Sequence, residues 1–227
     1  MLGSVARLER GAYIGDVTAL CAVPPPPTAD SAEARGRDTL LAGVGASVHW
    51  YDPLGGFDDA PALTLRVFAA ARVHGIAPAP SLDALLAPAR GPPLASLPGD
   101  EATTIAASAP PPPARAFVVF GERRVALVAL VAGDGVSVAA RHVSISRALP
   151  PLGHWVHDAR PLHPDAAAPA PAVALGLADN AVELWTFPAD PNDPPTRKRR
   201  VECAMRSMLY SLALRGDTAG ALEVAGH

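Results

Sequence analysis

A glycine recurs at the end of four short apolar segments, and this recurrence narrows the possible folds more than any other pattern in the chain. Each of these segments follows a stretch in which apolar and polar residues alternate, as they do in a half-buried strand. In three copies a tight turn and another apolar strand come next. The pattern predicts repeated antiparallel β-meanders that bury their apolar faces on one another. The four glycines are Gly43, Gly121, Gly176 and Gly226.

The clearest copy runs from Gly153 to Trp185. It opens with Gly153-His154, and Trp185 ends its third predicted strand. A Gly-His pair near the start and a tryptophan at the end of the third strand are typical of a WD-type propeller blade. Thr186 stands where the aspartate of the Trp-Asp dipeptide is expected. The predicted strands of this copy are 155–162, 172–177 and 181–185, with a turn at 179–180.

The sequence therefore predicts an all-β fold, an incomplete WD-repeat β-propeller with about three four-stranded antiparallel blades and the start of a fourth. The predicted blades are 13–68, 72–147 and 153–205, with a partial blade at 208–227. Residues 77–114, crowded with Pro, Ala, Ser and Gly, are predicted to be a disordered insertion, in which 81–86 alone has a weak helical pattern. The further predicted strands are 13–23, 39–43, 47–52 and 63–68 in the first blade, 72–76, 117–120, 125–130 and 136–143 in the second, 201–205 in the third, and 208–214 and 221–225 in the last.

A propeller closes its ring with roughly 4 to 8 blades. A chain with about three would leave open faces and unpaired edge strands at both ends of the stack. We therefore expect the chain to be the amino-terminal part of a longer protein, or a gene model cut short, that needs the remainder of its propeller. On its own, such a piece would be prone to aggregation.

Composition and charge place the chain among ordinary soluble globular proteins. It has 227 residues, 49% of them hydrophobic, and a formal net charge of −3, which argues against a strongly basic nucleic-acid binder. Residues 1–16 lack an uninterrupted apolar core, so no secretory signal is predicted. No window approaches the roughly 18 apolar residues that span a bilayer, which predicts no membrane partner and a location in the cytosol or nucleus. Cys21 and Cys203 are interpreted as small buried hydrophobes in a reducing compartment.

Seven segments, taken in order along the chain, also carry a family resemblance. They are GAYIGDVTALC (11–21), LLAGVG (40–45), RVHGI (72–76), FGERRV (120–125), GHWVHD (153–158), LADNAVELW (177–185) and the segment 206–224. Together they resemble the amino-terminal repeats of the large WD-repeat partner of the tRNA wobble-nucleotide 2′-O-ribose methyltransferase, the WD repeat-containing protein six family. In that family the chain continues into further propellers.

The resemblance implies a cytoplasmic accessory subunit without catalysis of its own. Such a subunit binds the methyltransferase and helps it present the anticodon loop of tRNA for methylation of the first anticodon nucleotide. It implies no catalytic, cofactor-binding or metal-binding residue in this part of the protein. From the fold alone, the alternative is a general WD-repeat scaffold, such as a signalling or trafficking adaptor.

Local motifs agree with a chain that has no active site of its own. Gly43-Val44-Gly45 follows a strand, but a second strand comes where a methyl-donor loop would need a helix, so a hairpin turn is predicted. His154, His157, Asp158 and His163 are close in sequence, but no cysteine lies nearby. His154 and His157 would also point to opposite faces of a strand, so a zinc site is not favoured.

Two polar features of the third blade complete the prediction. His154 is expected to bond the turn aspartate Asp179, while Leu175 stands where a hydroxyl would complete that network. The dense basic run Arg197-Lys198-Arg199-Arg200 is expected in an exposed loop between a Pro-rich segment and a strand. It is interpreted either as a contact to tRNA phosphates or a weak nuclear signal, or, by preference, as a solvated loop.

Overall fold

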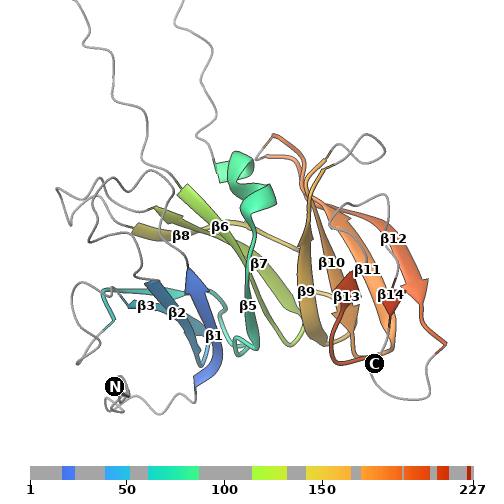
Figure 1. Ribbon diagram of the computed structural model, residues 1–227, viewed down its shortest axis with the longest axis horizontal. Helices are drawn as coiled ribbons and strands as arrows, with labels where there is room; N and C mark the ends of the chain where they lie inside the picture. Colours follow the sequence, from blue (N-terminus) through green and yellow to red (C-terminus); the bar gives the residue numbers. More distant parts are fainter. Residues whose placement is uncertain are drawn as a thin grey trace, which may run out of the picture.

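The computed structural model describes residues 17–23, 39–51, 61–86, 114–131, 142–164, 170–190, 192–204, 209–214 and 224–225, and every structural statement below concerns these residues. Their strands form three four-stranded antiparallel sheets and one two-stranded sheet, each built from strands consecutive in the chain. Figure 1 shows the three larger sheets side by side in chain order. None of the described helices is long and apolar enough to cross a membrane.

The three larger sheets are named here by their order. Sheet 1 contains β1 (Val17–Val23), β2 (Thr39–Val44), β3 (Ser47–Tyr51) and β4 (Leu63–Arg66). Sheet 2 contains β5 (Gly75–Pro78), β6 (Ala114–Gly121), β7 (Arg124–Val131) and β8 (His142–Ala148). Sheet 3 contains β9 (Val156–Leu162), β10 (Ala172–Leu177), β11 (Ala181–Thr186) and β12 (Thr196–Glu202), and the small sheet pairs β13 (Ala213–Leu214) with β14 (Val224–Ala225).

Both faces of sheet 2 are buried. Successive residues of a strand point to opposite faces of the sheet, so one strand can contribute side chains to two cores. In β6, Phe117 and Val119 belong to the core shared with sheet 1, whereas Val118 and Phe120 belong to the core shared with sheet 3. The outer face of sheet 3 packs in turn on residues 209–212, which come before β13. The sheets therefore stack face to face with one apolar core in each interval.

The edges of the sheets are arranged as in successive propeller blades. The first strands β1, β5 and β9 lie in contact, and the fourth strands β4 and β8 contact each other at the other edge. Inner strands gathered near an axis and outer strands at the rim are the blade arrangement of a propeller. The predicted all-β fold of four-stranded antiparallel blades is confirmed, including the pairing of 155–162, 172–177 and 181–185 within one sheet.

The second blade departs from its prediction at its start. The segment predicted to be disordered, 77–114, begins with ordered structure, because β5 extends to Pro78 and a 3₁₀ helix, η1 (Pro80–Leu86), follows. This helix is held in place by the fully buried side chain of Leu82 and by Asp83, whose Oδ1 accepts a hydrogen bond from the Ala116 N–H at 2.7 Å. Residues 87–113 of the predicted insertion lie outside the described residues.

The fourth strand of the second blade was predicted at the wrong place. The prediction was 136–143, but β8 is His142–Ala148, and residues 132–141 lie outside the described residues. The paired register explains the shift, because β8 aligns with β7 from Ala126 opposite Ala148 to Val131 opposite His142. Among residues 144–148 of this strand, the buried one is Arg147, whose guanidinium donates to the carbonyl oxygens of Pro188 and Ala189 in sheet 3's β11–β12 connection.

Candidate functional site

Three short turns and three linkers meet at one end of the sheets, which we call the turn face. The turns are 45–46, 122–123 and 178–180. The first two linkers are 67–74 and 149–155, and the third follows β12 and is described at residues 203–204 and 209–212. Each linker crosses the turn of the sheet it has just left: the Val73 N–H donates to the Gly45 carbonyl at 2.7 Å, and the Leu152 N–H to the Arg123 carbonyl at 3.0 Å. The third repeats the pattern, since the Leu209 N–H donates to Asn180 Oδ1 at 2.8 Å.

The recurring glycines mark the places where these linkers pass. A Cβ on Gly43 would lie 2.6 Å from Val73 Cγ1, and a Cβ on Gly121 would lie 1.6 Å from the carbonyl oxygen of Arg72. At both positions linker 67–74 lies so close to the second strand of a sheet that a side chain would collide with it. Gly176 has more room, because its nearest neighbour would be the Leu212 side chain at 3.2 Å. The feature that predicted the repeat therefore has a packing cause; Gly226 lies outside the described residues.

A chain of polar contacts runs across sheet 3 from the turn face toward its outer strand. His154 Nε2 lies 3.2 Å from Asp179 Oδ2, which confirms the predicted contact between this histidine and the turn aspartate. Arg200 Nη2 donates to the same oxygen of Asp179, and Arg200 Nη1 donates to Glu183 Oε1 at 3.0 Å. The indole N–H of Trp185 donates to Glu183 Oε2 at 2.9 Å. Arg200 and Glu183 thus continue the network that Leu175 was expected to leave incomplete.

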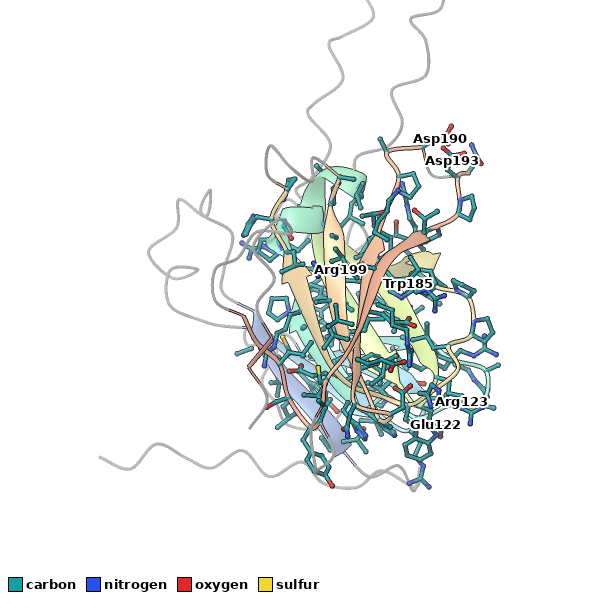
Figure 2. All side chains as sticks on the ribbon, turned by 90° about the vertical axis from the view of Figure 1, so that its right-hand side faces the viewer. Glu122, Arg123, Trp185, Asp190, Asp193 and Arg199 are labelled. Carbon is teal, nitrogen blue, oxygen red and sulfur yellow. The ribbon has the colours of Figure 1, made fainter. Side chains whose placement is uncertain are left out.

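The basic run was predicted in a loop, but the structure places it in β12. Arg197 and Arg200 both donate to Glu183 Oε1, at 2.8 and 3.0 Å. The reason is that Glu183 is only 3% exposed within β11, and a buried carboxylate requires partners. Lys198 and Arg199 are exposed and form no side-chain hydrogen bond or ion pair with other described residues, and Figure 2 shows Arg199 on the outer strand.

The electrostatics of this network keep its groups charged. Burial alone would raise the pKa of Glu183, but hydrogen bonds from Trp185, Arg197 and Arg200 outweigh it and lower that pKa below its ordinary value. Hydrogen bonds to Asp179 and Glu183 raise the pKa of Arg200. A carboxylate and a guanidinium fixed in their charged forms hold β12 on β11 and are poorly suited to exchange protons with a substrate.

The histidines and the acid considered for zinc are not brought together. His154 precedes β9 and contacts Asp179, while Asp158 accepts hydrogen bonds from the Ala159 and Leu212 N–H groups. His163 is exposed at the other end of β9. Among the described residues, no group of three or more metal-binding side chains is present.

The glycine-containing turn of sheet 1 and the two cysteines are the remaining predicted features. Gly43-Val44-Gly45 ends β2 and opens the turn to β3, as predicted, and Gly45 has φ +57°. Both cysteines are free; Cys21 is buried, which raises the pKa of its thiol to about 11, and Cys203 is partly buried.

An exposed aromatic and basic cluster on the turn face was not predicted. We call it the Trp155 patch, and it consists of Trp155, His74, Arg72, Arg123 and Arg124. The Trp155 side chain is 47% exposed, and its ring lies 5.5 Å from the ring of His74 at an angle of 51°. The three arginines are exposed. Aligning the predicted blades would have given the signal, since these residues all occupy turns or linkers, or directly adjoin them, at the same end.

The main chain brings the parts of the Trp155 patch together. The Val156 N–H donates to the Glu122 carbonyl at 2.6 Å, and the Ala178 N–H donates to the Trp155 carbonyl at 2.9 Å. The His74 N–H donates to the Phe120 carbonyl at 2.8 Å. The residue that carries the indole is therefore tied by main-chain bonds to sheet 2 on one side and to sheet 3 on the other.

Comparisons with known proteins give a fold likeness at low similarity. No protein-family model matches the chain, and no curated protein matches it. Among solved structures, it is similar to the crystal structure of BBS1N in complex with ARL6DN, soaked with lead, with a TM-score of 0.33 and 10% sequence identity. The match covers 89% of this chain and 59% of that chain. The propeller-like fold follows from the strand order and register of the sheets themselves.

Proposed function

We propose that this chain is a non-catalytic propeller subunit that acts as a protein-binding scaffold and that its partner is the tRNA wobble-nucleotide 2′-O-ribose methyltransferase. The observation that carries the scaffold role is the turn face. Its linkers and turns are bonded to one another through the main chain, while Trp155 and three arginines remain exposed on it. Binding residues are commonly found on loops held by a rigid framework of this kind.

The segments that resemble the WD-repeat family support the choice of partner. Residues 40–45 and 120–125 contain turns of the turn face, and 72–76 and 153–158 lead from its linkers into β5 and β9. These segments lie far apart in the sequence but at the same end of the sheets. A binding surface shared with that family would account for this clustering. The role implied is to hold the methyltransferase and help it present the anticodon loop in the cytoplasm.

The test is to co-express the tagged chain with the methyltransferase and capture the complex after nuclease treatment. We expect the methyltransferase to remain bound without RNA. Adding the chain should also raise the rate at which the enzyme transfers a methyl group to the first anticodon nucleotide of tRNA. Absence of both effects would overturn the choice of partner and leave the general scaffold of the alternative prediction.

A further inference from the structure

The Trp155 patch presents an aromatic surface to solvent on a bonded main chain. Nearly half of the Trp155 side chain is exposed, and its main chain is bonded on both sides, through Val156 to Glu122 and through its own carbonyl to Ala178. The His74 ring lies beside the indole at 5.5 Å. An aromatic ring that is already held in position loses little conformational freedom when a flat ligand stacks on it. Unpaired nucleic-acid bases are ligands of this shape.

Three arginines lie at the same end of the sheets as this aromatic surface. Arg72, Arg123 and Arg124 are exposed and form no side-chain hydrogen bond or ion pair with other described residues. Of the nearby acids that the structure describes, Asp179 already pairs with Arg200 and His154, which leaves the half-buried Glu122. Figure 2 places Glu122 and Arg123 at one end of the sheets and the acidic residues Asp190 and Asp193 at the opposite end. The patch is therefore locally basic although the chain as a whole carries a net charge of −3.

We propose that the Trp155 patch binds single-stranded RNA, stacking one unpaired base on Trp155 and placing the adjoining phosphates on the arginines. An acidic peptide would also be attracted by the arginines, but its carboxylate side chains offer no flat ring for the indole to stack on. A double helix keeps the faces of its bases covered by their neighbours. The inference rests on the proposed function only in taking tRNA as the physiological RNA.

The test uses the full chain without the methyltransferase. A labelled oligouridylate of about 12 nucleotides, within the usual range of site sizes, is titrated while its anisotropy and the tryptophan emission are recorded. Trp50 and Trp185 are only 4% and 7% exposed, so stacking should quench the emission of Trp155 selectively. We expect Trp155→Ala to weaken binding about 5- to 100-fold and Trp155→Phe to retain most of it. An abasic oligomer of the same length should bind about as weakly as the alanine variant binds RNA.

The matched controls change the same residue types elsewhere. Tyr210→Ala removes a 66% exposed aromatic side chain that lies beside His157, and the pair Lys198→Glu and Arg199→Glu reverses charge on β12. We expect both to leave the affinity unchanged. Arg123→Glu should weaken binding and reduce the slope of log affinity against log salt by about one.

Three results would overturn the inference. One is equal binding of the abasic oligomer with no effect of Trp155→Ala, which would reduce the patch to a general polyanion contact. Another is polyglutamate competing as well as the RNA, which would favour an acidic protein partner. The third is an equal loss of affinity in the control variants. Because the methyltransferase is absent, each of these results is independent of whether the chain captures that enzyme.

Discussion

Single residues decide how closely the linkers approach the sheets. Gly43, Gly121 and Gly176 share this task, but the room beside them differs, with would-be Cβ contacts from 1.6 to 3.2 Å. The shortest contact, at Gly121, is to a backbone oxygen, which cannot rotate away as a side chain can. Gly153 belongs to the Gly-His signature, yet a Cβ there would meet no atom within 4 Å. Glycines that look alike in the sequence therefore have different structural roles.

We expect Gly121→Ala to destabilise the protein by about 3 kcal/mol or more, because the methyl group would overlap the carbonyl oxygen of Arg72 and push the linker off the sheet. Gly153→Ala is the matched control and should change the free energy of unfolding by less than about 0.5 kcal/mol. Urea unfolding followed by circular dichroism measures both. Equal stability of the two variants would contradict the close approach described for Gly121.

The two thiols should differ in reactivity. Burial raises the pKa of Cys21 to about 11, so little of it is thiolate near pH 8, whereas Cys203 is only partly buried. We expect a disulfide reagent to modify one thiol in the native protein and both in urea. In Cys203→Ser, the native reaction should disappear. Rapid native modification in that variant would show that Cys21 is accessible.

At the scale of elements, the sequence predicted the strands whose apolar residues are buried and misplaced those whose residues are mostly polar. β10 and β11 matched to within one residue because both are buried along their whole length. The fourth strand of this blade was predicted at 201–205, but β12 is Thr196–Glu202. The basic run that begins this strand has no apolar alternation, and its partners Glu183 and Asp179 lie more than a dozen residues earlier, at positions that only the paired register reveals. The Trp155 patch was missed for the same reason, since it joins residues from separate blades. A local clue did exist, because Glu183 interrupts an otherwise apolar strand.

The attachment of β12 should depend on pH through Glu183. Its pKa in the folded protein lies below the ordinary value of 4.5, so its contribution is complete above about pH 4.5 and is lost as pH falls through the folded pKa. We expect Glu183→Gln to cost about 2 kcal/mol at pH 7 and progressively less below pH 4.5. The free energy of unfolding is measured from pH 7 to pH 3.

The control for this prediction is Glu202→Gln, which removes a carboxylate that is 84% exposed at the end of the same strand. It should have nearly the same stability as the wild type at every pH. A difference between Glu183→Gln and the wild type that does not shrink in acid would mean that Glu183 is not held in its charged form by its partners.

At the scale of the whole molecule, sheet 2 joins the other two. It contributes side chains to the core with sheet 1 and to the core with sheet 3, and Arg147 adds hydrogen bonds to the latter. Loss of this sheet would expose the inner faces of both neighbours. The three sheets should therefore unfold together, although each buried side chain packs in only one of the two cores.

Phe117→Ala tests this coupling. Phe117 packs only in the core with sheet 1, and its removal should cost about 3–5 kcal/mol. In variants that retain Trp50 of sheet 1 or Trp185 of sheet 3 as the single tryptophan, we expect the urea midpoint to fall equally for both probes. Ile145→Ala, at a side chain that is 42% exposed, should shift neither appreciably. A shift seen by Trp50 alone would mean that the sheets unfold separately.

Because each turn is crossed by the following linker, insertions should be tolerated less well at the turn face than at the other end of the sheets. A residue added to the turn at 122–123 would strike the linker that lies across it, so length at that end is constrained. The connections from Val23 to Thr39 and from Leu86 to Ala114 begin and end at the opposite end of the sheets, away from these crossings. Relatives of this chain can therefore differ greatly in size while keeping one end superimposable, and that conserved end is the part to align when they are sought.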